Sequence, residues 1–242
     1  MKPLKHSPLV RLVQRTRAIG EAAGLLPFLD AVPESPARFF RLDVDNDPYE
    51  PLLIAAWTPA VPLPAERYRL LVAHVGWTSR GLPVPDPELE IAITTNGEVP
   101  VSMRQTVPGG IRETRFLRQA PSDPAQVMLE PAAVHDAEEL WLVWSKALQW
   151  QRWEQAAAQA RPRLQTVLLL PDDEADERWL EMAVREAVPL LREDQARLLI
   201  SALRRQGGAD VQLLCCNQMD RLASALRSWG VSFRLAARKE EG

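Results

Sequence analysis

The chain starts with a helical pattern of apolar residues. Ser7 and Pro8 supply an N-cap and a first-turn proline, which are typical of a helix start. Apolar residues follow at helical spacing up to Gly24, at Leu9, Leu12, Val13 and Ile19. The pattern predicts one amphipathic helix near the N-terminus.

Between Ala37 and Ile93 the pattern changes to short apolar segments separated by prolines. Four of them are typical of antiparallel strands: "RFFRLDV", "PLLIAAW", "YRLLVAHVGW" and "LEIAITT". Asn96-Gly97 is a tight-turn signal after the fourth. A further strand pair is expected in "PVSMRQTV" and "IRETRFLR", joined through Gly109-Gly110. This part of the chain therefore predicts an antiparallel sheet.

Residues 136–160, "DAEELWLVWSKALQWQRWEQAAAQA", return to a helical pattern. Apolar residues occur there at helical offsets, at Leu140, Trp141, Trp144 and Leu148. We expect this helix to close the first domain by burying Trp141 and Trp144 against the sheet. Trp150 and Trp153 are candidates for an exposed contact surface.

A break at Arg161-Pro162-Arg163 divides the chain, because proline ends a helix. Beyond it we expect the order strand 166–170, helix 174–188, helix 193–205, strand 209–216, helix 218–228 and strand 231–236. The predicted fold class is α+β. We expect two domains, residues 1–160 and 161–242, since 242 residues suit two cores of ordinary size.

Charge and composition restrict the kind of partner. The net charge of −3 provides no chain-wide basic surface, which disfavours nucleic-acid binding. Arg11 and Arg15 share a helix face and are the best candidates for that alternative. The longest apolar run, residues 167–170, is far below the roughly 18 residues of a membrane span. Together with the arginines near the N-terminus, this predicts a cytoplasmic protein without a membrane segment.

Candidate chemistry in the N-terminal half is limited to His74, Asp86 and Glu88. One histidine and two carboxylates suit a metal or acid–base site, and a satisfied structural histidine is the other interpretation. The sequence contains no G-x-S-x-G, H-E-x-x-H, P-loop or G-x-G-x-x-G motif. The adjacent Cys215 and Cys216 lack the C-x-x-C metal spacing. We therefore expect no cofactor and favour a non-enzyme, with an enzyme or metal-dependent hydrolase centred on His74, Asp86 and Glu88 as the alternative.

The C-terminal stretch "QTVLLLPDDEADERWLEMAV", with the helices and strands that follow, resembles the ClpS adaptor family and the C-terminal domain of the ribosomal stalk protein. The resemblance covers about residues 165–239. It implies a small β-α-α-β-α-β fold that binds a peptide and delivers it to a Clp-type unfoldase. In ClpS proteins an Asn-Asp-Asp run and a histidine hold the α-ammonium of that peptide.

Transfer of the ClpS site to this chain is incomplete. Asp172 and Asp173 stand at the two acids, but Pro171 replaces the asparagine, and Arg204 stands at the histidine position. A guanidinium accepts no hydrogen bond and repels an ammonium. Glu177 replaces an apolar gate residue. The resemblance therefore implies a degenerate pocket.

Two readings of these pocket residues stay open. Asp172 and Asp173 either cap the following helix or form, with Arg204, a polar site for a partner peptide. Trp179 is either a core residue or part of the pocket, since it lies at helical spacing from Met182.

The N-terminal half resembles a bacterial family of unknown function that is common on plasmids and integrated elements. The resemblance spans about residues 35–155 and rests on His74, Asp86-Pro87-Glu88, Pro100-Val101 and the tryptophan helix. Together the two halves predict an adaptor-like interaction protein, associated with a mobile element, that binds a protein partner such as a Clp-type unfoldase or a peptide.

Overall fold

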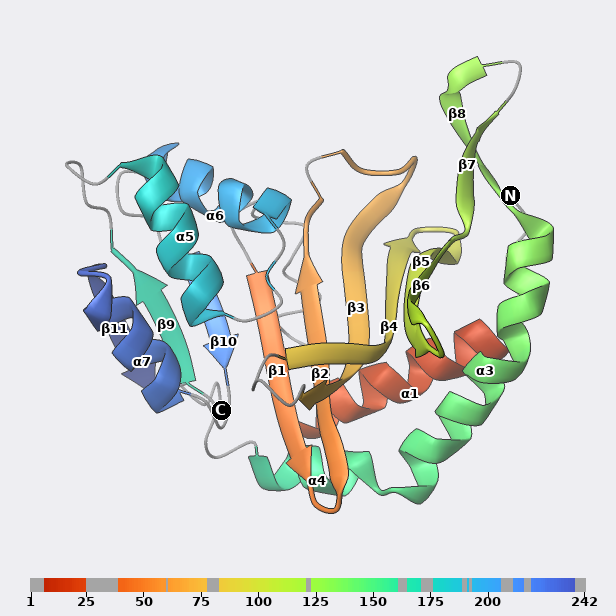
Figure 1. The fold of residues 1–242 in the computed structure, drawn as a ribbon, viewed down its shortest axis with the longest axis horizontal. Helices are drawn as coiled ribbons and strands as arrows, with labels where there is room; N and C mark the ends of the chain where they lie inside the picture. The colour runs from red at the N-terminus through yellow and green to blue at the C-terminus, as the bar shows by residue number, and fades with distance from the viewer. Residues whose placement is uncertain are drawn as a thin grey trace.

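The chain forms an α+β fold in which one nine-stranded sheet carries helices on both faces (Figure 1). A computed structural model describes residues 7–24, 39–59, 61–77, 83–120, 123–160, 165–170, 176–188, 191, 193–205, 211–215 and 219–237. The α+β class predicted from the sequence is confirmed.

Six strands follow one another in chain order as an antiparallel sheet. They are β1 (Phe39–Asn46), β2 (Tyr49–Trp57), β3 (Glu66–Trp77), β4 (Pro83–Thr94), β5 (Gly97–Val107) and β6 (Gly110–Arg115). The β4–β5 hairpin turns at Thr95-Asn96, one residue before the predicted Asn96-Gly97, and Thr94 pairs with Gly97 at the start of β5. A separate two-stranded ribbon, β7 (Leu117–Ala120) and β8 (Asp123–Leu129), projects from the body (Figure 1). The sequence did not predict this ribbon.

Three strands of the C-terminal part extend the same sheet beyond β1. They are β9 (Gln165–Leu169), β10 (Val211–Cys215) and β11 (Phe233–Ala237), in the spatial order β11-β9-β10-β1. β10 pairs with β1 in parallel, with Phe39 opposite Leu213. The sheet is thus continuous across both expected domains. The boundary expected at residues 161–163 lies outside the described residues, and independent folding of the two parts stays a prediction.

Helices cover the two faces of the sheet in two groups. One face carries α1 (Pro8–Ala22), α3 (Pro131–Trp150) and α4 (Trp153–Ala160); the other carries α5 (Glu177–Ala187), α6 (Glu193–Arg205) and α7 (Met219–Ser228). Strand β2 is buried on both sides, because Leu52 and Ile54 face the first group while Leu53 and Ala55 face the second. This explains why "PLLIAAW" is apolar at every position instead of alternating. Of the helices in the described residues, none combines the length and apolar character needed to cross a membrane.

The prediction of one helix over residues 136–160 is wrong in one respect, because this segment belongs to two helices. α3 ends at Trp150, and α4 begins at Trp153 after Arg152, which adopts a positive φ of 58°. Asn46 donates a hydrogen bond from its Nδ2 to the backbone oxygen of Gln151 at 2.6 Å. Since this bond comes from the β1–β2 hairpin, the break depends on tertiary structure and carries no proline or glycine signal.

Candidate binding site

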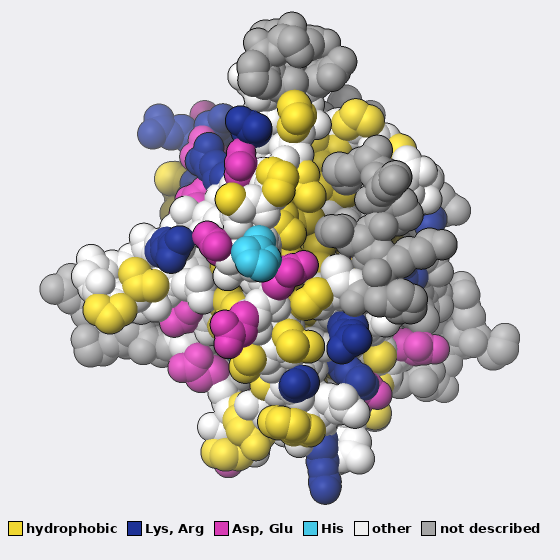
Figure 2. Space-filling model, turned by 90° about the vertical axis from the view of Figure 1, so that its right-hand side faces the viewer, with side chains coloured by type: hydrophobic (Ala, Val, Ile, Leu, Met, Phe, Trp, Pro, Cys, Tyr) yellow, Lys and Arg dark blue, Asp and Glu magenta, His cyan; other side chains and the backbone are white. Residues whose placement is uncertain are grey.

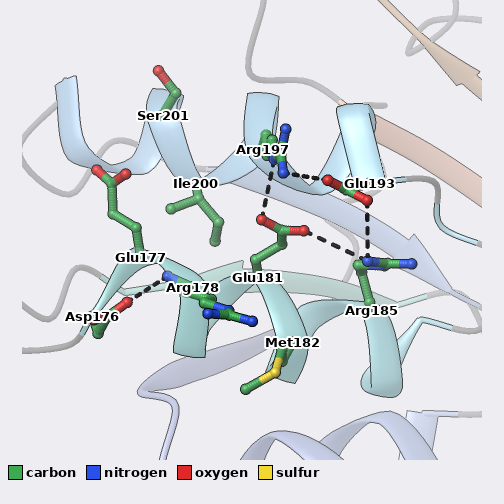
Figure 3. A pocket seen from close by; sticks show the side chains of 10 residues that line it. All are labelled: Asp176, Glu177, Arg178, Glu181, Met182, Arg185, Glu193, Arg197, Ile200 and Ser201. Atoms are coloured by element: carbon green, nitrogen blue, oxygen red, sulfur yellow. Dashed lines mark hydrogen bonds and ion pairs between the residues drawn. The ribbon is translucent and has the colours of Figure 1, made fainter.

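A groove of about 800 Å³ lies between α5 and α6 (Figure 3). It is lined by charged, polar and apolar side chains of both helices. These are Asp176, Glu177, Arg178, Glu181, Met182, Arg185, Glu193, Arg197, Ile200 and Ser201. Its size falls in the range of ligand-binding pockets, which is about 300–1,000 Å³.

The α5 wall follows from the helix periodicity. Asp176 is the N-cap and accepts a hydrogen bond from the backbone N–H of Arg178 at 2.7 Å. The buried positions of α5 face the sheet, at Leu180, Ala183, Val184 and Ala187. Residues 177, 181 and 185, spaced four apart, therefore form a stripe beside this face and line the groove.

The α6 wall is built in the same way. Its apolar side is buried against the sheet, at Ala196, Leu199, Ile200 and Leu203. Glu193, Arg197 and Ser201 are again spaced four apart and line the groove. Glu193 and Arg197 reach toward α5, where they pair with Arg185 and Glu181 (Figure 3). The matched spacing of the two stripes was present in the sequence, but it pointed to a site only once the helices were known to be neighbours.

Four charges at one end of the groove form a closed ring of ion pairs. The Glu181 carboxylate lies 3.6 Å from Arg185 and 3.3 Å from Arg197. The Glu193 carboxylate lies 3.8 Å from Arg185 and also pairs with Arg197. The ring joins the two helices, so this end is electrostatically satisfied (Figure 3).

The other end of the groove holds an unpaired acid. Glu177 points toward the Ser201 end of α6, away from the ring (Figure 3). Within the described part of the chain it makes no ion pair. Ile200 and Met182 add apolar surface nearby. This end offers a carboxylate and apolar contacts to a bound group.

Only some of the residues that the ClpS resemblance implies can be placed relative to this groove. Glu177 lines it, and Arg204 lies on α6 one turn beyond Ile200. Asp172 and Asp173 lie outside the described residues. The expected helix start at residue 174 is corrected to Glu177, and the N-cap of α5 is Asp176.

Trp179 does not line the groove. It lies on the α7 side of α5, 46% exposed, with its ring 4.6 Å from that of Trp229 in a T-shaped arrangement. It is therefore not part of the same pocket as Glu177.

His74, Asp86 and Glu88 are not brought together. His74 faces α3 and α4, with its ring 5.9 Å from Trp144 and 5.4 Å from Trp153. Glu88 pairs in register with Ala73, which faces α5–α7, so its side chain lies on the opposite side of the sheet. Asp86 accepts a hydrogen bond from the backbone N–H of Thr106 at 3.0 Å.

His74 is half-buried, and this setting favours its neutral form. Its Nδ1 lies 3.2 Å from the backbone oxygen of Glu50, so Nδ1 carries the proton and donates it. Desolvation lowers the pKa of His74 and outweighs the opposing effect of the Glu50 carbonyl and charge. Among the described residues, no three His, Cys, Asp or Glu side chains are grouped to hold a metal.

A buried ion cluster on the α5–α7 face of the sheet went unpredicted. Arg69 donates to Glu66 at 2.6 Å and also pairs with Glu90, which accepts from Ser102 at 3.3 Å. Burial alone lowers the pKa of Arg69, but the hydrogen bond to Glu66 and the charge of Glu90 hold it above its ordinary value. We interpret this cluster as structural, since its charges satisfy one another.

Arginines do not form a basic stripe where the sequence offered one. Arg15 of α1 pairs with Glu154 of α4 at 2.6 Å, which removes its charge from the candidate Arg11–Arg15 surface. On the face in Figure 2, lysine and arginine side chains lie in separate groups with acidic side chains among them. Neither feature favours nucleic-acid binding.

A family model described as a domain of unknown function (DUF6908) matches residues 24–154. The chain belongs to this family, whose match spans more than half of its length. The matched range closely follows the resemblance expected over residues 35–155, whereas the α5–α6 groove lies beyond it. No curated protein and no solved structure matches the chain.

Proposed function

We propose that this protein is a non-catalytic, adaptor-like interaction module whose α5–α6 groove binds a segment of a protein partner. The observation that carries the proposal is the groove itself, with an ion-pair ring at one end and, at the other, Glu177, which pairs with no charge among the residues that the structure describes. A carboxylate beside apolar surface suits a peptide that brings a cationic or hydrogen-bonding group.

The resemblance to ClpS supports a peptide ligand for the same region, because Glu177 and Arg204 belong to the residues it singles out. The order β9-α5-α6-β10-α7-β11 agrees with the β-α-α-β-α-β order that the resemblance implies. Delivery to a Clp-type unfoldase and association with a mobile element belong to the same proposal.

The hydrolase alternative is not retained. It requires His74, Asp86 and Glu88 to converge in one cleft, but His74 and Glu88 lie on opposite faces of the sheet.

The proposal is tested by site-specific crosslinking in the full chain. A photoreactive residue at Ser201 should capture a partner, while the same residue at Glu139, exposed on α3, should not. A peptide copied from the crosslinked segment is then titrated by fluorescence anisotropy. Glu177→Arg should weaken its binding about tenfold or more, because it replaces an attraction by a repulsion. Equal capture at both positions, or equal affinity of the variant, contradicts the proposal.

A further inference from the structure

A second surface of α5 lies beside the groove, where α5 packs against Trp229 at the end of α7. Helices α5 and α7 are neighbours (Figure 1), and Met182 of α5 borders both the groove and this second surface. Trp179 and Met182 are 46% and 43% exposed and stand three residues apart, so they are neighbours on the helix. Trp229 packs against Trp179. We define Trp179, Met182, Glu186 and Trp229 as the tryptophan shelf.

Hydrogen bonds hold the shelf in one arrangement. Trp179 donates from Nε1 to the backbone oxygen of Trp229 at 3.0 Å. Trp229 in turn donates from its Nε1 to Glu186 Oε2 at 2.7 Å. Both indoles and the carboxylate are thus oriented before any ligand arrives, which reduces the entropy cost of binding.

The shelf is chemically suited to a ligand that carries both a basic group and an apolar group. Trp179 and Met182 present exposed apolar surface, and the Trp face also attracts cations. Glu186 keeps acceptor capacity beyond its bond to Trp229, because an ionised carboxylate has about four lone-pair sites. The neighbouring Arg185 is engaged in the ion-pair ring, so it leaves the charge of Glu186 available.

Spacing defines the shape of the ligand. Trp179 and Glu186 are two helical turns apart, about 10.5 Å along α5. A helix lying alongside α5 matches both positions with one apolar side chain and one arginine seven residues away.

We propose that the tryptophan shelf docks a partner helix that carries an apolar residue and, two turns from it, an arginine. Complementary charge selects this occupant, since the shelf's own charged group is Glu186. Trp179, Glu186 and Trp229 are not among the residues that line the groove, and Met182 borders both surfaces. The inference does not depend on what the groove binds.

The test uses the full chain and a synthetic alanine- and glutamine-based helical peptide with one leucine and, seven positions later, one arginine. Binding is followed through the NMR signals of the indole N–H groups. The signals of Trp179 and Trp229 should shift and saturate with peptide at up to about 1 mM. Replacing the peptide arginine by glutamate should weaken binding about fivefold or more.

Glu186→Gln should remove the difference between the two peptides, as a double-mutant cycle requires for a direct pair. The matched control is Glu139→Gln, an exposed carboxylate of α3 for which the difference between peptides should persist. Unfolding in urea checks that both variants are folded.

The proposal is overturned by any of four results: no saturable shift, equal binding of both peptides, shifts confined to the exposed Trp150, or a peptide preference that survives Glu186→Gln. Shifts of Trp179 and Trp229 that depend on protein concentration without peptide would assign the shelf to a second copy of the chain, and would equally overturn it.

Discussion

His74 and Glu88 point to opposite faces of the sheet although they lie on the neighbouring strands β3 and β4. His74 is half-buried and lies against the rings of Trp144 of α3 and Trp153 of α4, whereas Glu88 is buried on the side of α5–α7. A histidine in this setting is compatible with the fold in its neutral form, so the free energy of unfolding depends on pH.

The first prediction concerns that dependence. The pKa of His74 is lowered in the folded state relative to about 6.5 in an unfolded chain. Below about pH 6.5 the unfolded chain binds a proton that the folded chain excludes, so stability falls as pH falls through this range. His74→Gln should reduce the loss of stability between about pH 7.5 and pH 5.5, measured by urea unfolding.

The control for this experiment is His135→Gln, on the exposed face of α3. It should keep the pH dependence of the wild type. An identical dependence in His74→Gln and the wild type would contradict the assigned burial of His74.

The second prediction concerns the buried ion cluster. Arg69→Met leaves Glu66 and Glu90 without their shared cation in a site where the three side chains are at most 10% exposed. Unpaired buried charges are costly, so the free energy of unfolding should fall by about 3–5 kcal/mol. Arg118→Met is the matched control, because its pair with Glu130 is exposed and should contribute about 0–1 kcal/mol. Equal losses in the two variants would show that Arg69 is not effectively buried.

The third prediction concerns Trp150 and Trp153, which the sequence analysis both offered as candidates for an exposed contact surface. Trp150 is 77% exposed, but Trp153 is fully buried, with its Nε1 donating to Gln151 Oε1 at 2.8 Å. Trp153→Ala should lower the free energy of unfolding by about 3–5 kcal/mol. Trp150→Ala should change it by about 0.5 kcal/mol or less. Urea unfolding of both variants measures the difference, and similar values would argue against the break between α3 and α4.

Local patterns predicted the elements well where they depend on local chemistry. The N-cap Ser7 accepts a hydrogen bond from the backbone N–H of Val10, at the expected start of α1. The helix expected over residues 193–205 agrees with α6, because the buried face of α6 repeats at helical spacing.

Non-local features could not be predicted in the same way. The pairing of Phe39 with Leu213 joins strands far apart in sequence, and neither residue signals a particular partner. The faces of His74 and Glu88 depend on the register of β3 with β4, which shifts between Ala73 and Val75. A shift of one residue moves a side chain to the other face, so residue spacing alone did not reveal their separation.

The groove could not be predicted from the sequence either. The four-residue spacing of Glu177, Glu181 and Arg185 was visible in the sequence, but a charged stripe on one helix is usually only solvated. Its meaning comes from the opposing stripe on α6, and hence from the packing of two helices.

The last prediction concerns peptides with a free, bulky N-terminal residue. If the C-terminal part works as the proposed ClpS-like module, several acceptors would be needed to hold the peptide α-ammonium, each contributing about 1.5–3 kcal/mol. The resemblance expected from the sequence puts Pro171 and Arg204 at two of those positions. The loss should lower affinity about hundredfold or more, so peptides that begin with Phe, Leu, Trp or Tyr should not bind measurably at micromolar concentrations.

Fluorescence anisotropy with free and N-acetylated versions of the same peptide tests this expectation. Low-micromolar binding that disappears on acetylation would contradict it. The double change Pro171→Asn with Arg204→His is the gain-of-function control and should create measurable binding if the adjoining apolar pocket is intact. Because the carboxylate of Glu177 lines the groove, we expect it to hinder binding of a bulky apolar side chain even in this variant. Adding Glu177→Met to the double change should therefore strengthen binding further, whereas no binding in the triple variant would mean that the groove is shaped for a different ligand.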